Sequence, residues 1–316
     1  MKTSIPAPAP RKFSLFFERF MKHSLPYFLI LPAVISLVLF SLSPFISGIW
    51  YSFTSIGWIN DIVKFIGLSN YQQILVGAVG IAKFFRLAVV QTIYWTVFGV
   101  AGQFVLAMAT ALILNEKFPG RFIFRTAVLV SIAMPTVVLA LTWQWMYDPF
   151  YGIVNHYLYL LGVIHNPNTI WVGSTNSTIW PLIVVSIWRG FPFMSLMLLS
   201  GMQGISQELY EAAKVDGANV LDRFWHITLT QMRTTIMITL VLNIIWTWNS
   251  FDIVMVVGST WGVVASKALT LPLLAWVDSF RWNHLGRGAA VSVMSMVLIL
   301  GLLFWSARRE LRSVTE

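Results

Sequence analysis

Long apolar segments recur along the chain, and short segments that contain charged residues separate them. No Asp, Glu, Lys or Arg occurs in residues 23–60, 87–115, 126–147, 149–188, 234–251 or 288–307. A helix that crosses the hydrocarbon core of a bilayer needs about 20 mostly apolar residues. Taking account of turn signals inside the longest segments, we predict six membrane-spanning helices, at about 27–50, 87–114, 123–146, 178–201, 234–257 and 288–306.

The length of these segments also distinguishes two kinds of membrane fold. Only helices and closed β-barrels satisfy every backbone group in lipid. Barrel strands are alternating segments of about ten residues, far shorter than the apolar segments here. We therefore expect an all-α polytopic membrane protein, with a cytoplasmic tail at 1–26, a six-helix domain at 27–306 and a second cytoplasmic tail at 307–316.

The composition excludes other classes of protein. Of the 316 residues, 57% are hydrophobic and 10% are charged, whereas roughly a quarter of the residues in a soluble domain are charged. A soluble monomer of this composition would expose large apolar patches, and a disordered chain has low hydrophobicity instead. The net charge of +9 raises the question of nucleic acid, but the basic residues gather at the ends of spans, so we expect no nucleic-acid partner.

The distribution of basic residues predicts the orientation. Cytoplasmic loops of membrane proteins are enriched in Lys and Arg. With six spans, 14 of the 21 Lys and Arg residues fall on the side of the two termini and six fall on the other side. We therefore predict a multi-pass membrane protein with both termini in the cytoplasm.

No arrangement of residues indicates catalysis or a bound cofactor. The chain has no cysteine, and none of its five histidines has another histidine three or four residues away. The glycine-rich phosphate loop that ends in Gly-Lys-Ser/Thr is absent as well. We expect no metal, no cofactor and no enzymatic activity in this chain, so that any ATP-driven transport would need another subunit to hydrolyse the nucleotide.

The cytoplasmic loop between the fourth and fifth predicted spans, residues 203–232, is long, amphipathic and interrupted by one glycine. Ser206 is a suitable N-cap for a helix that continues to Lys214. Gly217 can adopt the left-handed conformation that ends such a helix, and Asn219 can cap a second short helix. We predict two short helices joined at a tight elbow, which together form a protrusion that another protein could bind.

A motif with specific spacing lies in this loop. The tripeptide EAA at 211–213 is followed by Gly217 after three residues and then, nine residues later, by Ile227 and Leu229. This segment resembles the EAA loop of permease subunits of ATP-binding-cassette importers. The segments NEKFPGRFIFRT, YGIVN, IWRGFPF and ELYEAAKVDGA are similar to the carbohydrate-uptake branch, the maltose-type permeases. Thr230 stands where that family usually has proline.

The resemblance implies a subunit of a larger machine of the bacterial inner membrane that imports a sugar or oligosaccharide. The implied partners are a second homologous permease, two ATPase subunits that bind ATP and Mg, an extracytoplasmic sugar-binding protein and membrane lipid. It also implies that the ATPase contact involves Glu211, Ala212, Ala213, Asp216, Gly217, Ile227 and Leu229. ATP-driven closure of the ATPase pair would move these loops and produce alternating access to a site near mid-membrane.

Polar residues in the predicted spans indicate a path for the sugar. Asn243, Thr247 and Ser250 recur on one face of the fifth span, and Asp252 lies near its outer end. Polar residues in a span usually face the bundle interior or a water-filled cavity. The resemblance places these residues, and also Arg189, Gly190 and Phe193 of the fourth span, at sugar-site positions. An alternative interpretation of the polar face is hydrogen bonding between helices.

Arg189 is the costliest residue to insert in a membrane, at about 2.5–3.5 kcal/mol for a helix centre. Its partner could be Asp252, an acidic residue of the second permease, or a carboxylate on the substrate, such as a uronate oligosaccharide. Asp252 also carries the alternative function, an ion-coupled secondary transporter, because it is the one candidate for a coupling carboxylate in a span. A polytopic membrane enzyme would need clustered His or carboxylates, which this sequence lacks.

Overall fold

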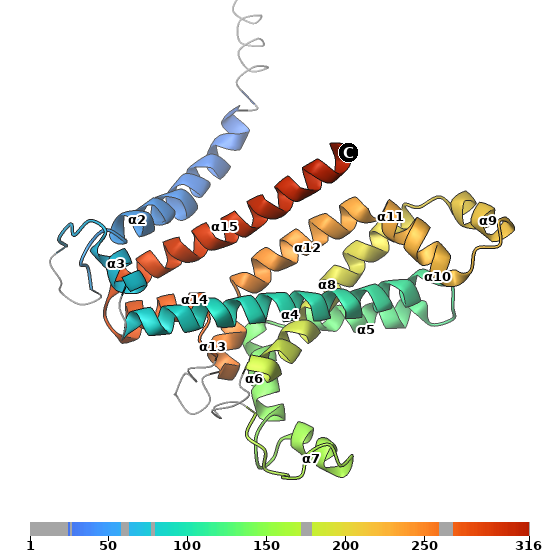
Figure 1. Ribbon diagram of the computed structural model, residues 1–316, viewed down its shortest axis with the longest axis horizontal. Helices are drawn as coiled ribbons and strands as arrows, with labels where there is room; N and C mark the ends of the chain where they lie inside the picture. The colour runs from blue at the N-terminus through green and yellow to red at the C-terminus, as the bar shows by residue number, and fades with distance from the viewer. Residues whose placement is uncertain are drawn as a thin grey trace, which may run out of the picture.

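The computed structural model describes residue 25 and residues 27–57, 63–76, 80–171, 179–258 and 268–315 (Figure 1). Nearly all of the predicted N-terminal tail, 1–26, therefore lies outside the described residues. The described part is helical or irregular, apart from one isolated bridge between Thr54 and Phe65. In chain order its helices are η1 (Val38–Leu42), α2 (Ser43–Tyr51), α3 (Ser69–Val76), α4 (Ile81–Asn115), α5 (Arg121–Ala133), α6 (Thr136–Met146), α7 (Ile153–Leu160), α8 (Ile179–Gln203), α9 (Gln207–Val215), α10 (Val220–Arg223), η2 (Phe224–Thr228), α11 (Leu229–Gln231), α12 (Arg233–Trp248), α13 (Asp252–Gly258), α14 (Leu271–Trp276), η5 (Val277–Arg281) and α15 (Leu285–Thr315).

Four of the described helices are long and apolar enough to cross a membrane. They are Tyr27–Tyr51, α4, α8 and the segment Leu285–Phe304 of α15, and they overlap the first, second, fourth and sixth predicted spans. Two bent pairs of helices also qualify if each pair is counted as one span, which gives up to six spans. The first pair is α5 with α6, and the second is the segment Val220–Gln231 with α12. The chain is thus an all-helical polytopic membrane protein, as the sequence predicts. The helix of the last span continues to Thr315, beyond the predicted boundary at 306.

The third predicted span, 123–146, is a bent pair and not one straight helix. Its two halves, α5 and α6, meet at an angle of 97°. Pro135 accounts for the break, because proline has no N–H to donate and disfavours helical backbone at the preceding residue. Met134 accordingly has an extended conformation, with a ψ of 130°.

The fifth predicted span, 234–257, is also interrupted. α12 ends at Trp248, and α13 begins at Asp252 after an irregular segment. The side-chain amide of Asn249 donates a hydrogen bond to the carbonyl oxygen of Ile245 (2.8 Å), which also accepts the N–H of Asn249 (3.2 Å). Such local side-chain bonds compete with continuation of a helix, and Asn249 is the C-cap of α12.

Three helices form the centre of the fold, since α4 packs along α8 and α12 packs against both. Gly99 of α4 allows the close approach: a Cβ at this position would lie 3.4 Å from Cγ2 of Thr247 and 3.5 Å from Oγ of Ser186. The indole N–H of Trp95, one helical turn earlier, donates to the carbonyl oxygen of Thr247 (2.8 Å). This buried bond joins α4 to α12 in the part of the bundle where lipid would provide no partner.

The first span is held differently. None of the most apolar window of Tyr27–Tyr51 is buried within the chain, and the α2 part of this span packs against α15. An exposed apolar surface of this extent suits contact with lipid or with another subunit.

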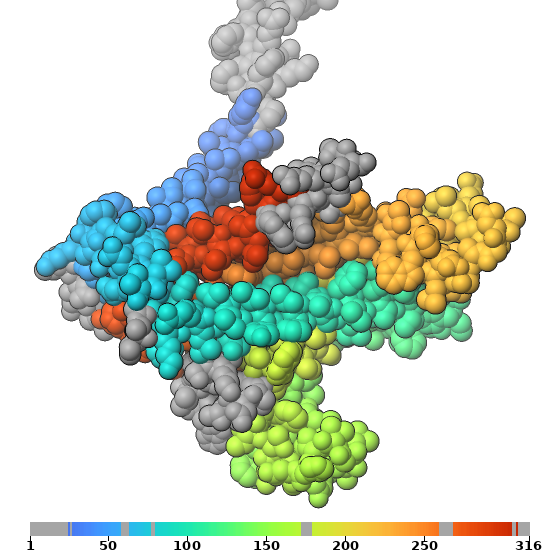
Figure 2. Space-filling view, in the orientation of Figure 1, coloured from blue at the N-terminus to red at the C-terminus, as the bar shows by residue number. Residues whose placement is uncertain are grey.

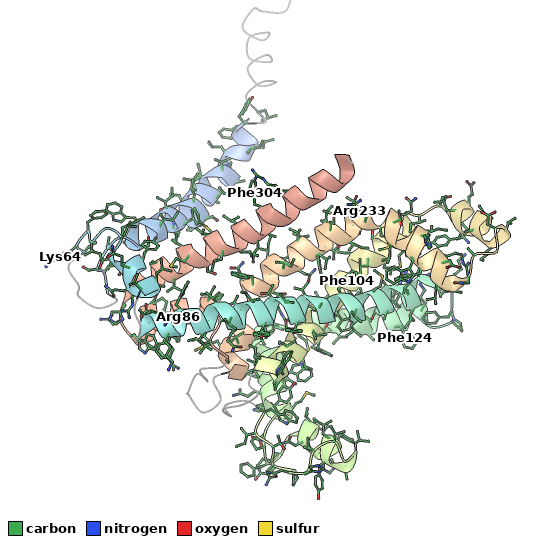
Figure 3. The ribbon with its side chains drawn as sticks, in the orientation of Figure 1. Lys64, Arg86, Phe104, Phe124, Arg233 and Phe304 are labelled. Atoms are coloured by element: carbon green, nitrogen blue, oxygen red, sulfur yellow. The ribbon has the colours of Figure 1, made fainter. Side chains whose placement is uncertain are left out.

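The two ends of the bundle differ in shape. Residues 207–231, which carry α9 to α11, form a protrusion at one end (Figure 2). Figure 3 places Lys64 and Arg86 toward the opposite end and Arg233 close to the protrusion. The loop that the sequence predicts as a protein contact therefore lies at one end of the helix bundle and is accessible to a partner.

Candidate substrate cavity and coupling loop

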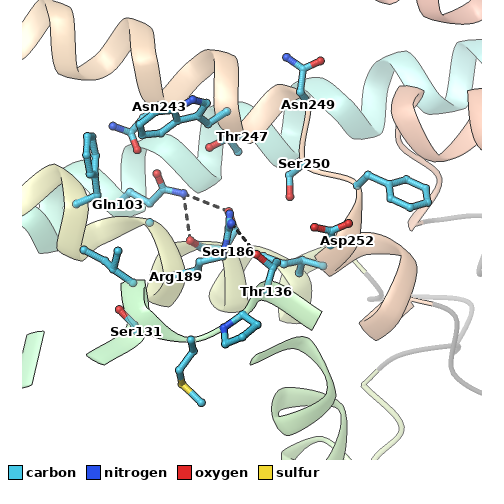
Figure 4. Close-up of a pocket in the computed structure, with 18 of the residues that line it drawn as sticks. Gln103, Ser131, Thr136, Ser186, Arg189, Asn243, Thr247, Asn249, Ser250 and Asp252 are labelled. Atoms are coloured by element: carbon cyan, nitrogen blue, oxygen red, sulfur yellow. Dashed lines mark hydrogen bonds between the residues drawn. The ribbon is translucent and has the colours of Figure 1, made fainter. Parts of the chain in front are cut away.

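An open cavity of about 810 Å³ lies where the two interrupted spans meet, and residues of α4, α5, α6, α8, α12 and α13 line it (Figure 4). The breaks at 134–135 and 249–251 both contribute to its wall. Irregular backbone at membrane depth is tolerated where it lines a cavity, and transporters bind substrates beside interrupted helices. The cavity is lined by all seven residues that the sequence singles out for the sugar path: Arg189, Gly190, Phe193, Asn243, Thr247, Ser250 and Asp252.

Asn243 and Thr247 lie on the buried side of α12, with exposed fractions of 3% and 6%. The amide of Asn243 donates to the carbonyl oxygen of Thr239 in the same helix (2.9 Å). The alternative interpretation requires a hydrogen bond from these side chains to a neighbouring helix. Within the described segments, neither side chain forms one. The hydroxyl of Thr247 and the carbonyl oxygen of Asn243 thus remain available at the cavity wall.

An aromatic pair forms another part of the wall. The rings of Phe193 on α8 and Trp246 on α12 meet edge to face, with centroids 4.8 Å apart. Phe193 is half-buried, and Trp246 is exposed. Aromatic rings of this kind offer a flat apolar surface beside the polar groups, a combination that suits the two faces of a sugar ring.

The cavity carries one cation and one anion. Arg189 donates a hydrogen bond from Nη2 to Oγ1 of Thr136 (2.8 Å), the first residue of α6. Asp252 lies in the first turn of α13, where the helix dipole stabilises a carboxylate. Both side chains are exposed, and they form no ion pair with each other, so the structure does not contain the Arg189–Asp252 pair that was one of the three predicted possibilities.

Several lining residues are not among those predicted from the sequence. Among them are Gln103, Ser131, Thr136, Ser186 and Asn249. Each is a polar residue in an apolar segment, and such residues usually face the bundle interior or a cavity. Their common location depends on how four separate helices and the break after α12 pack together, and one sequence does not specify that packing.

The residues of the coupling loop, 203–232, have the predicted local structure. Oγ of Ser206 accepts the backbone N–H of Glu208 (3.3 Å) at the start of α9. Asn219 caps α10 through a reciprocal pair of bonds with Asp222. Between these helices Gly217 has a φ of +83°, and the N–H groups of Gly217 and Ala218 bond to the carbonyls of Lys214 and Ala213. This is a Schellman ending, and it forms the predicted elbow.

The loop is joined to the membrane helices by contacts of its second arm. Leu229 packs, with Phe224, against the buried cluster of Met108, Leu198 and Met232. The hydroxyls of Tyr210 and Thr228 are hydrogen-bonded (2.9 Å) and connect α9 to η2. Four other residues of the predicted ATPase contact, Glu211, Ala212, Asp216 and Gly217, are exposed, and Ala213 and Ile227 are half-buried. A force on α9 would therefore reach the helices that line the cavity.

The sequence of the region that contains the cavity and the coupling loop identifies the family of the chain. Residues 103–310 match the family described as the inner membrane component of binding-protein-dependent transport systems. The chain belongs to this family. Among the described residues of the permease, no group of three His, Asp or Glu side chains could hold a metal ion.

Individual relatives agree with this family. The permease is 33% identical to the trehalose/maltose transport system permease MalF of Thermococcus litoralis, over 89% of this chain and 92% of the relative. It is 30% identical to the sulfoquinovosyl glycerol transport system permease SmoG of Agrobacterium fabrum, over 85% of both chains. Its fold matches a chain of a bacterial importer of the acidic polysaccharide alginate, with a TM-score of 0.78, 19% identity and coverage of 94% and 98%.

These findings define the role of the permease. It is a non-catalytic, multi-pass inner-membrane subunit of a binding-protein-dependent ATP-binding-cassette importer of sugars. ATP is bound by partner ATPase subunits, and a periplasmic binding protein belongs to the complex. The alternative function, an ion-coupled secondary transporter that depends on Asp252, is therefore wrong.

Proposed function

We propose that the sugar crosses the membrane through the cavity between α8 and α12, and that Asn243, Thr247, Ser250 and Asp252 bind its hydroxyls. The supporting observation is that both interrupted spans, an aromatic pair and all seven predicted residues meet at one cavity (Figure 4). Phe193 covers an apolar face of the ring, and Gly190 leaves room for packing at the cavity wall.

Two threonines of α12 provide a matched test of this path. Thr247 lines the cavity, and its hydroxyl has no hydrogen-bond partner among the described residues. Thr239 is equally buried, but its hydroxyl donates to the carbonyl oxygen of Thr235 (2.6 Å). We expect Thr247→Val to lower sugar uptake by the reconstituted importer about fivefold to tenfold, because a neutral hydrogen bond contributes about 1 kcal/mol. Thr239→Val should leave uptake near the wild-type rate, and equal rates for the two variants would contradict the proposal.

We also infer that the sugar is acidic. The carboxylate of Asp252 is stabilised by its own helix, whereas Arg189 has only a hydroxyl partner in the described structure. The start of α6 has no side-chain cap, so its free N–H groups favour an anion beside Thr136. An anionic group of the sugar would pair with Arg189 and accept hydrogen bonds from these N–H groups of α6. The inference is supported by the alginate importer, which imports an acidic polysaccharide, and by the relative that is named for sulfoquinovosyl glycerol transport.

Substitutions that remove or keep the charge of Arg189 test whether the sugar is acidic. In proteoliposomes we expect Arg189→Gln to reduce uptake of an oligouronate at least tenfold and uptake of a neutral analogue of the same length less than threefold. Arg189→Lys, which keeps the charge and loses the planar guanidinium, should have an intermediate effect. An equal loss for both sugars would mean that Arg189 has a structural partner.

The orientation and the remaining partners complete the proposal. The coupling loop lies at the cytoplasmic face, both termini are cytoplasmic, and the exposed residues Glu211, Ala212, Asp216 and Gly217 contact one of two ATPase subunits. The exposed first span supports contact with a second permease subunit. Lys214 and Arg223 lie in the loop and Arg233 lies beside it, which is consistent with enrichment of basic residues on the cytoplasmic side.

A further inference from the structure

Gln103 of α4 is a polar residue of the cavity wall. It belongs to none of the sequence motifs described above, and no role has been assigned to it. It lies in the wall of the cavity, at the seam between α4 and α8, with an exposed fraction of 2%. It follows Trp95 and Gly99 at intervals of four residues and so shares the face of α4 that packs against the other two central helices. Figure 4 shows its side chain between Ser186 and Asn243.

The orientation of the Gln103 amide is determined by its neighbours. Nε2 donates to the carbonyl oxygen of Ser186 (3.1 Å) and to Oγ of the same residue (3.2 Å). A backbone carbonyl can only accept, so the nitrogen and not the oxygen must face Ser186. Gly190 provides the space: a Cβ at this position would lie 2.4 Å from Cδ of Gln103 and 2.6 Å from both terminal atoms of the amide.

This arrangement leaves the carbonyl oxygen of Gln103 without a donor. It is buried and has no hydrogen-bond partner in the described structure. A buried acceptor that has lost its water and found no donor is energetically unfavourable, and most such groups in native proteins have a partner. Sugars carry rotatable hydroxyl donors on several ring carbons, which makes a hydroxyl of the transported sugar a suitable partner at the wall of this cavity.

We propose that Gln103 is a further substrate-binding residue, whose carbonyl oxygen accepts a hydrogen bond from a hydroxyl of the sugar during translocation. This inference rests on the proposed path through the cavity. The oxygen is closed to solvent in this conformation, so the bond forms after the sugar has entered and the wall has opened. Loss of the acceptor should therefore lower the turnover of transport and leave unchanged the concentration of loaded binding protein that gives half-maximal uptake, because docking precedes this contact.

The same helix provides a matched control. Gln91 of α4 also has a carbonyl oxygen that is buried and without a partner, but it does not line the cavity. The experiment compares Gln103→Met with Gln91→Met in the complete importer, reconstituted in proteoliposomes with its binding protein. Each change replaces an amide by an apolar side chain of similar length. Radiolabelled uptake is measured with the neutral and uronic-acid oligosaccharides that the wild type transports.

We expect kcat for uptake to fall at least tenfold in Gln103→Met with little change in KM, and to stay within twofold of wild type in Gln91→Met. Gln103→Glu retains acceptor oxygens but loses the donor to Ser186, so it should recover less than full turnover. Wild-type turnover in Gln103→Met would overturn the inference. An equal fall in both variants would also overturn it, because loss of any buried amide of α4 would then explain the effect.

The outcome for Thr247→Val separates this inference from the proposed path. If Thr247→Val reduces uptake and Gln103→Met does not, the sugar passes through the cavity without using Gln103. If neither variant reduces uptake, the path itself is wrong. Gln103→Met and Gln103→Glu both lose the bonds to Ser186, so both complexes should unfold at a lower temperature than the wild type. A turnover that is no higher in Gln103→Glu, which keeps acceptor oxygens, than in Gln103→Met would assign Gln103 a packing role instead.

Discussion

Replacement of Gly217 by valine is expected to lower sugar-stimulated ATP hydrolysis by the importer more than tenfold. Gly217 has a φ of +83° at the elbow between α9 and α10, and a left-handed backbone costs an L-residue about 1–2 kcal/mol. Valine is among the residues that tolerate this conformation least. The elbow should relax by changing φ, which would break the bonds from Gly217 and Ala218 to the end of α9 and turn the exposed residues of α9 away from their contact.

The control for this prediction is Gly217→Asn, because asparagine adopts the left-handed conformation far more readily. A Cβ at this position would meet no atom within 4 Å, so the two substitutions differ in backbone strain and not in crowding. ATP hydrolysis by the purified importer with loaded binding protein should fall more than tenfold in the valine variant and less than threefold in the asparagine variant. Equal activity in both would mean that the elbow does not transmit the coupling.

Local features of the fold could be predicted from the sequence because they depend on neighbouring residues. Ser206, Gly217 and Asn219 perform the capping and turning roles that their residue types indicate, and the charge-free segments locate the apolar helices. The interruptions were harder to predict. Pro135 is a visible signal, whereas α12 ends at Trp248 beside Asn249, whose side-chain bond to Ile245 is not specified by the sequence.

The candidate site could be predicted in part, because some of its residues share one face of a single helix. The periodicity of Asn243, Thr247 and Ser250 identifies one helix face, and the structure places that face on the cavity. Gln103 lies 140 residues before Asn243 in the chain, and its contact with Gly190 and Ser186 arises only when α4 packs on α8. Periodicity within one helix contains no information about which residue of another helix lies opposite.

The seam between α4 and α8 is the second position where a single substitution should have a large effect. We expect Gly190→Val to prevent assembly of a stable importer or to lower its unfolding temperature strongly. A Cβ at Gly190 would overlap the Gln103 amide at 2.4 Å, and Gln103 has little room to move because it is 2% exposed and bonded twice to Ser186. Overpacking of this kind costs about 1–3 kcal/mol, and each lost hydrogen bond adds about 1 kcal/mol.

Two further variants test whether this contact is the cause. Gly301→Val makes the same change in α15, at a glycine with no atom within 4 Å of the added Cβ, so its unfolding temperature should stay close to that of the wild type. Gly190→Ala with Gln103→Ala removes the overlapping amide and should unfold at a higher temperature than Gly190→Ala alone. If the double variant is no more stable than the single one, the glycine is required for a reason other than Gln103. Recovery of stability without recovery of uptake would instead separate the two roles of the seam, because packing would be restored while the amide that we propose to meet the sugar would still be missing.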